Sequence, residues 1–490
     1  MTREERLARL ARGVDVLVVG GGATGAGIAW DAASRGLTVG VLEARDFGAG
    51  TSSRSTKLIH GGVRYLAQGR LGLVREALAE RELLARQAPA LVKPLAFAVP
   101  VMAWTEALKF RAGLAAYDLL AGRDRFPPSA WCSATALAQA VPGLRRGVFR
   151  GGVRYYDGQF DDTALLFAVL RAASAQGALC VNYAPLTRLL LRAGRVGGGV
   201  CIDEETGREH EVPARCVVNA TGANAAAVQA LDPRARAVPL QLSRGSHLVV
   251  PARFLGGDTA ILMPRVDDGR VMFAIPWRGH TLLGTTDLAT AAFEAEPMPG
   301  AAEIDAILAT AARYLEPAPT RAEVTAMFCG LRPLAGTGGE ATARVSREHV
   351  LVRSDSGLVT ITGGKWTTFR RMAEETIDFA LAGSGLAAGS SRTAQQTLMP
   401  VAAPDVDTPL PGLAFGEEAC RRAVRLDYAR RTEDILARRC RALFTDVDAA
   451  RVAAPRVAAI VGAELGRAAA AVAADLAAFT TLAARYSLRG

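Results

Sequence analysis

The stretch that decides the fold runs from Val14 to Leu66 and reads VDVLVVGGGATGAGIAWDAASRGLTVGVLEARDFGAGTSSRSTKLIHGGVRYL. It opens with an apolar run, Val14–Val19, which is typical of a buried parallel strand. Three glycines in GxGxxG spacing, a helix-compatible segment and a second strand that delivers Glu43 follow. The glycines are Gly20, Gly22 and Gly25. Such glycines let backbone N–H groups approach a pyrophosphate at the helix N-terminus, while the acid accepts a hydrogen bond from a ribose hydroxyl. The stretch therefore predicts a dinucleotide-binding site.

Two later segments also carry a strand into a glycine turn. The first is CVVNATGA, residues 216–223, and the second is LVTITGGKWTTF, residues 358–369. A strand that ends in such a turn can lie beside the first strand and add backbone to the wall of the nucleotide site. For the first segment, an ordinary turn explains the pattern equally well. Together the segments point to one cofactor held by three glycine corners.

At 490 residues the chain is too long for one hydrophobic core, so two or three domains are expected. Residues 239–287 are strand-rich, as in a separate sheet that carries a substrate. Residues 383–416 are rich in Gly, Ala, Ser and Pro and are typical of a linker. From Glu417 onward only helices are expected, with breaks at Asp446 and Pro455.

The composition narrows the class of protein. The net charge of +10 suits an anionic substrate or an anionic membrane surface, but an even excess of arginine explains it equally well. Lysines are rare among the 58 basic residues, and two of the four, Lys57 and Lys365, lie in loops of the expected site. The seven cysteines show no metal-ligand or CxxC spacing, so we expect no metal site and reduced thiols in an intracellular protein. No segment is typical of a signal peptide or a membrane span.

Several motifs resemble those of one enzyme family, the FAD-dependent glycerol-3-phosphate dehydrogenases. In chain order they are TSSRSTKLIHGGVRYL (51–66), GSHLVVP (245–251), IPWRGHTLLGTTD (275–287), CGLRPL (329–334) and TGGKWTTFR (362–370). The resemblance extends from about Asp15 to Phe369 with no motif missing. The C-terminal helices also resemble the helical cap of that family, although the part before Arg421 is shorter than usual.

This resemblance implies an α/β fold with a Rossmann-like FAD-binding domain, an antiparallel-sheet substrate domain and a C-terminal helical cap. It implies oxidation of sn-glycerol 3-phosphate to dihydroxyacetone phosphate by hydride transfer to FAD, with a quinone as electron acceptor. The alternatives are an oxidase that passes electrons to oxygen, an amine or hydroxy-acid oxidase of the same superfamily, and a flavin-bound protein without turnover. The phosphate-binding arginine expected in GGVRYL argues against an amine oxidase.

The resemblance also implies how the chain is divided. The FAD-dependent region is expected over residues 14–385. Its FAD-binding parts are 14–90, 155–235 and 330–385, and its substrate-domain parts are 91–154 and 236–329. A linker over 386–416 and a helical cap over 417–490 follow.

The site residues are assigned by the motifs of the resemblance. FAD is expected to contact Gly20, Gly22, Ala23, Thr24, Gly25, Glu43, Thr51, Ser52, Ser53, Ala220, Gly222, Gly364 and Lys365. The substrate is expected to contact Arg64, Tyr65, Arg332, Lys365 and Thr368. A guanidinium grips phosphate oxygens bidentately, although Arg332 has the alternative of stabilising the developing alkoxide. Imidazole is suited to taking the hydroxyl proton near neutral pH, so His60 is the first choice of base and His247 the second.

The expected partners are glycerol 3-phosphate and a quinone, with no nucleic acid and with a homodimer left open. The expected location is the cytoplasm, and peripheral contact on the cytoplasmic face of the inner membrane is left open. Residues 2–12, with Leu7, Leu10 and four arginines, are a candidate for that contact. A frayed terminal helix explains those residues equally well.

Overall fold

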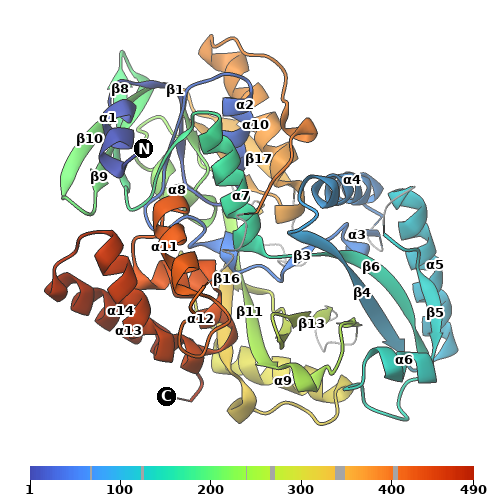
Figure 1. Cartoon of the computed structure of the whole chain (residues 1–490). Helices are drawn as coiled ribbons and strands as arrows, with labels where there is room; N and C mark the ends of the chain where they lie inside the picture. Colours follow the sequence, from blue (N-terminus) through green and yellow to red (C-terminus); the bar gives the residue numbers. More distant parts are fainter. Residues whose placement is uncertain are drawn as a thin grey trace.

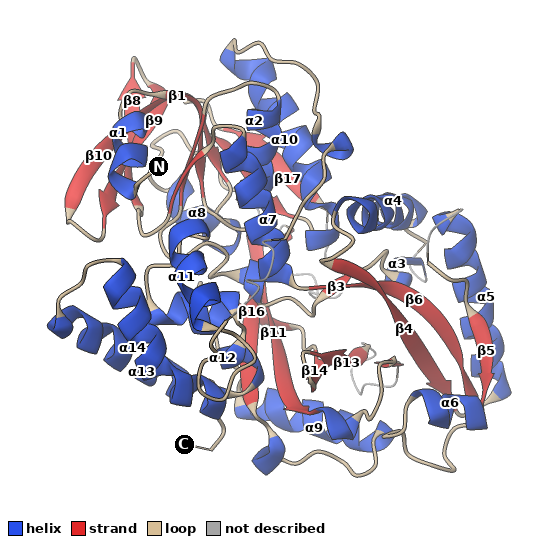
Figure 2. Ribbon diagram, in the orientation of Figure 1, coloured by secondary structure: helices blue, strands red, loops and turns tan. Residues whose placement is uncertain are grey.

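The computed structural model describes residues 1–66, 69–122, 126–238, 240–264, 271–336, 348–400 and 407–489; of Arg64 only the backbone is described. The described chain forms two sheets and a C-terminal helical region, which lies beside both (Figures 1 and 2). The N-terminal strand lies in the first sheet, and the C-terminal helices extend along the lower left of the view in Figure 1.

The first sheet is built around β1 (Val14–Val19), which pairs in parallel with β2 (Val39–Leu42) and β10 (Arg208–Asn219). The full order is β17-β18-β10-β1-β2-β7, and only β17 is antiparallel to its neighbour along this path. The other bounds are β17 (His349–Arg353), β18 (Val359–Gly363) and β7 (Leu179–Val181). The carboxyl ends of β1, β10 and β18 therefore meet at one edge, where open α/β sheets bind their ligands.

Helices cover one face of this sheet because its strands are apolar on both sides. The covering helices are α2 (Ala23–Ser34), α7 (Asp162–Ala175) and α10 (Phe369–Ser384), and they share one core cluster with the strands. On the other face lie α1 (Arg3–Leu10) and the hairpin of β8 (Leu186–Arg192) and β9 (Arg195–Asp203). Leu7 and Leu10 of α1 are buried in that second cluster, so the apolar side of this helix is not free for a membrane.

The second sheet is the antiparallel sheet that the resemblance predicted, with one parallel pair, β12 and β4. Its order is β15-β11-β14-β13-β12-β4-β6-β3, with β16 paired to β11 and β5 paired to β6. The bounds are β3 (Leu58–Ile59), β4 (Val92–Val101), β5 (Ala130–Ser133), β6 (Gly151–Phe160), β11 (Leu240–Pro251), β12 (Ala260–Met263), β13 (Met272–Trp277), β14 (His280–Gly284), β15 (Leu288–Thr290) and β16 (Ala326–Ala335). Two of the expected boundaries between FAD-binding and substrate-domain parts, at 154/155 and 329/330, fall inside β6 and β16. Each of these strands therefore contains residues of both expected parts.

The remaining helices surround these sheets. They are α3 (Val63–Leu66), α4 (Leu71–Gln87), α5 (Trp104–Ala121), α6 (Ala134–Ala140), α8 (Ala225–Gln229) and α9 (Ala301–Tyr314), with short 3₁₀ turns at Thr51–Ser53, Gly222–Asn224, Ala252–Phe254, Arg321–Glu323, Trp366–Thr368 and Thr393–Gln395. Among the described helices, none has both the length and the apolar composition needed to cross a membrane.

The C-terminal region consists of helices, as expected. They are α11 (Glu417–Leu426), a π-helix (Asp434–Arg439), α12 (Ala442–Thr445), α13 (Val447–Glu464) and α14 (Ala469–Arg485). Asp446 ends one helix and caps the next, as predicted, since its carboxylate accepts from Ala449 N–H. The predicted break at Pro455 is wrong, because α13 continues through it. Ala454 and Val457 on either side are buried in the core cluster, and this packing offsets the backbone hydrogen bond that proline cannot make.

Candidate active site

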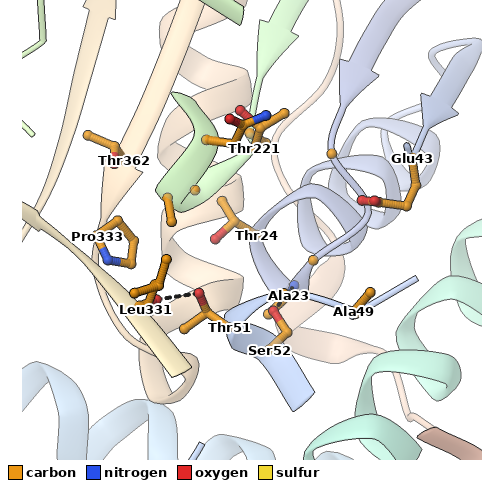
Figure 3. Close-up of a pocket in the computed structure, with 18 of the residues that line it drawn as sticks. Ala23, Thr24, Glu43, Ala49, Thr51, Ser52, Thr221, Leu331, Pro333 and Thr362 are labelled. Atoms are coloured by element: carbon orange, nitrogen blue, oxygen red, sulfur yellow. Dashed lines mark hydrogen bonds between the residues drawn. The ribbon is translucent and has the colours of Figure 1, made fainter. Parts of the chain in front are cut away.

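A cavity of about 400 Å³ opens at the edge of the first sheet where β1, β10 and β18 end. Residues of all three glycine corners line it, namely Gly20, Gly22, Ala23, Thr24, Ala220, Thr221, Gly222, Gly363, Gly364 and Lys365. Figure 3 shows Thr24 and Glu43 of the first corner around the same space as Thr221 and Pro333. Segments more than 300 residues apart in the chain therefore form one site, as the sequence predicted.

Close backbone contacts explain why glycine is required at two positions of the first corner. Gly20 has φ +105°, and a Cβ there would lie 2.7 Å from the carbonyl oxygen of Ala220, so β1 and β10 approach each other through this residue. A Cβ on Gly25 would lie 1.8 Å from the carbonyl oxygen of Gly20. Gly25 does not line the cavity; it lets α2 begin directly against the turn, which is the packing role of the third glycine in this motif.

The N-terminus of α2 points its backbone donors at the cavity. Its N-cap, Gly22, has no side chain to bond them, and the Ser52 hydroxyl accepts from Ala23 N–H at 2.9 Å. Glu43 follows β2 and accepts from Gly21 N–H at 2.6 Å. Burial raises the pKa of this carboxyl, and the N–H groups of Arg45 and Gly21 partly offset the effect. The corner thus presents donors suited to a pyrophosphate and an acid suited to a ribose.

A smaller cavity of about 190 Å³ adjoins the first one. The two share six lining residues, Thr51, Arg54, Pro333, Gly364, Lys365 and Trp366. His60, His247 and Arg332 line the smaller cavity as well. The arrangement places both predicted bases and two predicted cations around one small space next to the larger cavity.

Arg332 on β16 is held by the turn that follows β14. Its Nη2 donates to the Thr285 hydroxyl at 2.7 Å and its Nη1 donates to the Thr286 carbonyl at 3.0 Å. The Asp287 carboxylate lies 3.7 Å from Nη1. These contacts leave the guanidinium partly exposed to the cavity in a fixed orientation.

The two histidines differ in their environments. His60 is half-buried, and its backbone N–H donates to the Thr367 hydroxyl at 3.2 Å. His247 is 1% exposed, stacks on the Phe328 ring, and its Nε2 lies 3.0 Å from the Thr56 hydroxyl. Burial, with the charges of Lys57 and Arg332, lowers the pKa of His247 well below its ordinary value, so this ring is neutral at physiological pH. A neutral ring can accept a proton, but the depressed pKa makes His247 a weaker base than an ordinary imidazole.

Of the other predicted residues, Lys365 lines both cavities, whereas Tyr65, Thr368 and Ser53 do not line them. The Nζ of Lys365 lies 4.0 Å from the centroid of the Tyr65 ring. Tyr65 is buried behind that ammonium, while the Thr368 hydroxyl donates to the Lys365 carbonyl at 3.4 Å at the start of α10. Ser53 is buried, and its carbonyl accepts from Lys57 Nζ at 2.8 Å. The prediction for the Arg64 side chain lies outside the described residues.

Arg54 and Thr56 are among the residues of the smaller cavity that sequence reasoning missed, and it also missed the partner of Arg332. Arg54 lies between the cavities, and Thr56 lies against His247. Thr285 bonds the Arg332 guanidinium. All three stand inside motifs that were already recognised, TSSRSTKL and GTTD, so the motifs could have found them. Only the pairing of β11 with both β14 and β16 brings Thr285 to Arg332.

Comparison with known proteins identifies the family of the chain. Residues 15–370 match the model of the family described as FAD dependent oxidoreductase. The chain belongs to this family. Residues 393–472 of the oxidoreductase match a second model, described as the C-terminal domain of alpha-glycerophosphate oxidase. The predicted fold and the FAD cofactor are thereby confirmed, and the α2 N-terminus, Glu43 and the larger cavity fit such a dinucleotide.

The oxidoreductase is also similar to individual proteins. It is 40% identical over 395 residues to the mitochondrial glycerol-3-phosphate dehydrogenase of Homo sapiens, covering 77% of this chain and 54% of that protein. It is 41% identical over 369 residues to glycerol-3-phosphate dehydrogenase 2 of Mycobacterium tuberculosis, covering 75% of this chain and 63% of that protein. The glycerol-3-phosphate dehydrogenase of Bacillus halodurans, solved with FAD, matches with a TM-score of 0.78 at 26% identity, over 99% of this chain and 97% of that one. The chain spans about half to two thirds of the length of the curated relatives, and the resemblance to glycerol-3-phosphate dehydrogenases is confirmed.

Proposed function

We propose that this oxidoreductase oxidises sn-glycerol 3-phosphate to dihydroxyacetone phosphate, with FAD as the hydride acceptor. The observation that carries the proposal is the smaller cavity, which is lined by Arg332, Lys365 and His60. It adjoins the larger cavity, which suits FAD and is called the FAD cavity below. Two cations suit a phosphate dianion, and an imidazole suits a hydroxyl proton. The similarity to glycerol-3-phosphate dehydrogenases supports the same substrate.

The roles of the side chains follow from that chemistry. Bound FAD supplies the site for the hydride. His60 takes the hydroxyl proton from the substrate, and Arg332, fixed by Thr285, holds a phosphate oxygen or the oxygen that becomes the ketone. Lys365 provides a compact positive charge at the junction of the two cavities. Arg64 stays a proposed phosphate ligand on the strength of its motif.

We infer a quinone as the acceptor that reoxidises the flavin, with oxygen as the alternative. The relatives are named dehydrogenases, which favours an acceptor other than oxygen, whereas the C-terminal family model is described from an oxidase and keeps oxygen as the alternative. An anaerobic titration of the purified protein with glycerol 3-phosphate should bleach the flavin absorbance, and added quinone should restore it. A flavin absorbance that stays unchanged during the titration would contradict the substrate assignment. Rapid oxygen consumption with glycerol 3-phosphate in the absence of quinone would show that oxygen is the acceptor and that the enzyme is an oxidase.

We further propose that α5 (Trp104–Ala121) makes the peripheral contact with an anionic membrane. Three large apolar side chains lie on its outer surface at helical spacing, Trp104 (63% exposed), Leu108 (71%) and Leu119 (83%). Exposed Lys109 and Arg111 lie beside them. An apolar stripe with a tryptophan and flanking cations suits an anionic lipid surface. The helix lies alongside β5 and β6 of the second sheet, on the opposite side of the view from the C-terminal helices (Figure 1).

A further inference from the structure

A loop between β15 and α9, residues 291–299, forms one wall of the FAD cavity. Phe293, Glu294, Ala295 and Pro297 of this loop line the cavity. Within the described chain, these residues make no backbone-to-backbone hydrogen bond to another segment. Met298 packs against two core clusters, and most of the polar contacts of the loop involve Glu296. The position of the wall therefore depends on what holds Glu296.

Glu296 is held from both ends of the chain. Its carboxylate accepts from Arg54 Nη2 at 2.6 Å and lies 3.4 Å from Arg45 Nη1, and both arginines line the FAD cavity. The hydroxyl of Tyr486 donates to the same carboxylate, and Arg485 Nη2 donates to the Glu296 carbonyl at 2.8 Å. Burial would raise the pKa of Glu296, but Arg54 and the Tyr486 hydroxyl hold it below its ordinary value. The carboxylate is therefore charged at neutral pH.

Tyr486 is itself firmly placed at the end of α14. It is 1% exposed, its ring lies edge-on to Phe444, and its carbonyl accepts from Met327 N–H at 3.0 Å. Met327 is the second residue of β16, the strand that carries Arg332. Arg54, on the other side of Glu296, donates to the Cys329 carbonyl of the same strand at 3.3 Å. Tyr486 and Arg54 thus fix the wall loop against β16 from two directions.

We propose that Tyr486 and Glu296 act as a latch that closes loop 291–299 over the FAD cavity, so that the C-terminal helical region determines how tightly FAD is held. The two residues are positioning residues, since neither lines the cavity among the described residues. Tyr486 also lies beyond residues 393–472, the part that matches the C-terminal family model. The latch rests on the FAD cofactor of the family and is independent of which substrate is oxidised.

The test is FAD release from the full-length holoprotein. Tyr486→Phe keeps the ring and removes only the hydroxyl, and loss of a hydrogen bond to a charged group should raise the Kd for FAD roughly tenfold. Release is followed by the rise in flavin fluorescence after dilution, and hydrogen exchange reports the opening of residues 291–299. Glu296→Gln, which also removes the charge facing Arg54, should release FAD faster still.

Tyr428→Phe is the matched control. Its hydroxyl bonds the Ser174 hydroxyl at 2.6 Å between the same C-terminal region and α7, and neither residue lines the cavity. The latch predicts wild-type FAD affinity and wild-type exchange of residues 291–299 in this control. Equal FAD affinity in wild type and Tyr486→Phe, or a lowered Tm without faster exchange of the loop, would overturn the latch. A wild-type chain that takes up no FAD would overturn the cofactor assignment itself.

Discussion

The guanidinium of Arg332 lies against the backbone of Gly245. A Cβ on Gly245 would lie 2.2 Å from Nη2 of Arg332 and 2.8 Å from the Thr285 hydroxyl. The φ of Gly245 is not in the left-handed region, so the backbone conformation does not require glycine. Glycine is needed at this position because a Cβ would collide with Arg332 and Thr285. The residue in front of the Ser246-His247 pair therefore determines where a cation of the smaller cavity lies.

Gly245→Ala should displace Arg332 without disturbing the FAD cavity. Because displacement of a substrate-positioning group by about 1 Å can cost on the order of 100-fold, kcat/KM for glycerol 3-phosphate should fall by roughly that factor. FAD content, measured by absorbance, should stay at the wild-type level. Gly72→Ala is the control, because a Cβ there meets open space. Unchanged kcat/KM in Gly245→Ala would show that the position of Arg332 does not limit the reaction.

His60→Ala tests the proposed base. General-base catalysis contributes about 10²–10⁴-fold, so anaerobic stopped-flow reduction of the flavin by glycerol 3-phosphate should slow by that order. FAD should remain bound, since His60 lines only the smaller of the two cavities. His210→Ala, on the edge hairpin of the first sheet, serves as the control. If His247→Ala slows the step and His60→Ala does not, the role passes to His247.

At the scale of elements, α5 differs from the other surface helices. It carries Leu119 and Leu108, whose exposed fractions exceed those of the other large apolar side chains of the described residues. Its inner side packs through Leu114 and Tyr117, so the helix is anchored while its outer stripe stays exposed. The N-terminal helix, which the sequence offered for the same purpose, has its leucines buried instead.

Replacing both Leu108 and Leu119 by Gln should weaken vesicle binding by on the order of 100-fold or more, because each leucine loses roughly 1.5–3 kcal/mol of apolar transfer and about 1.4 kcal/mol is tenfold in affinity. Co-sedimentation with phosphatidylglycerol vesicles measures the effect, and phosphatidylcholine vesicles test the dependence on lipid charge. Val452→Gln, at a 61% exposed position on α13, is the matched control. Equal binding by all variants would contradict the proposal, and a homodimer that dissociates in the double variant would assign the face to a second copy of the chain.

At the scale of the whole molecule, buried charges join the FAD-binding region to the C-terminal helices. Asp46 follows the second strand and accepts hydrogen bonds from Arg438 and Arg439. Lys57 Nζ lies 2.6 Å from Asp162, whose other oxygen is 3.3 Å from Arg441. Removing one partner from such a group leaves an uncompensated buried charge, which costs more than the pair gains. These contacts couple the two regions into one structure.

Lys57 makes the stability depend on pH. Burial and the charge of Arg441 lower the pKa of Lys57 to about 7, although the carboxylates of Asp162 and Asp161 act to raise it. Between that value and about 10.5 the unfolded state binds a proton that the folded state has lost, so the contribution of Lys57 to stability rises with pH. The Tm of wild type minus that of Lys57→Met should therefore grow by a few degrees from pH 7 to 9. Lys93→Met, at an exposed lysine, should show a constant difference. A constant difference for Lys57→Met as well would contradict the lowered pKa.

Features that depend on local chemistry could be predicted from the amino-acid sequence alone. GxGxxG spacing, the strands on either side and Glu43 specify a dinucleotide corner, because strand, turn and helix N-terminus all lie within about 30 residues. The helix-compatible segment after the glycine turn folds as α2 (Ala23–Ser34), as predicted. All the residues that line the smaller cavity stand inside the recognised motifs, although only some of them were predicted as site residues.

Which residues meet across the chain depends on the three-dimensional packing of the strands and helices. Nothing in the local sequence places Thr285 on Arg332 or Tyr486 on Glu296, because sheet pairing and the docking of the C-terminal helices bring them together. The burial of His247, and with it the lowered pKa, likewise depends on neighbours from other strands. The ion-pair partners of most of the 54 arginines could not be predicted from the sequence for the same reason. Whether a charge has a partner depends on the side chains that the three-dimensional structure brings next to it.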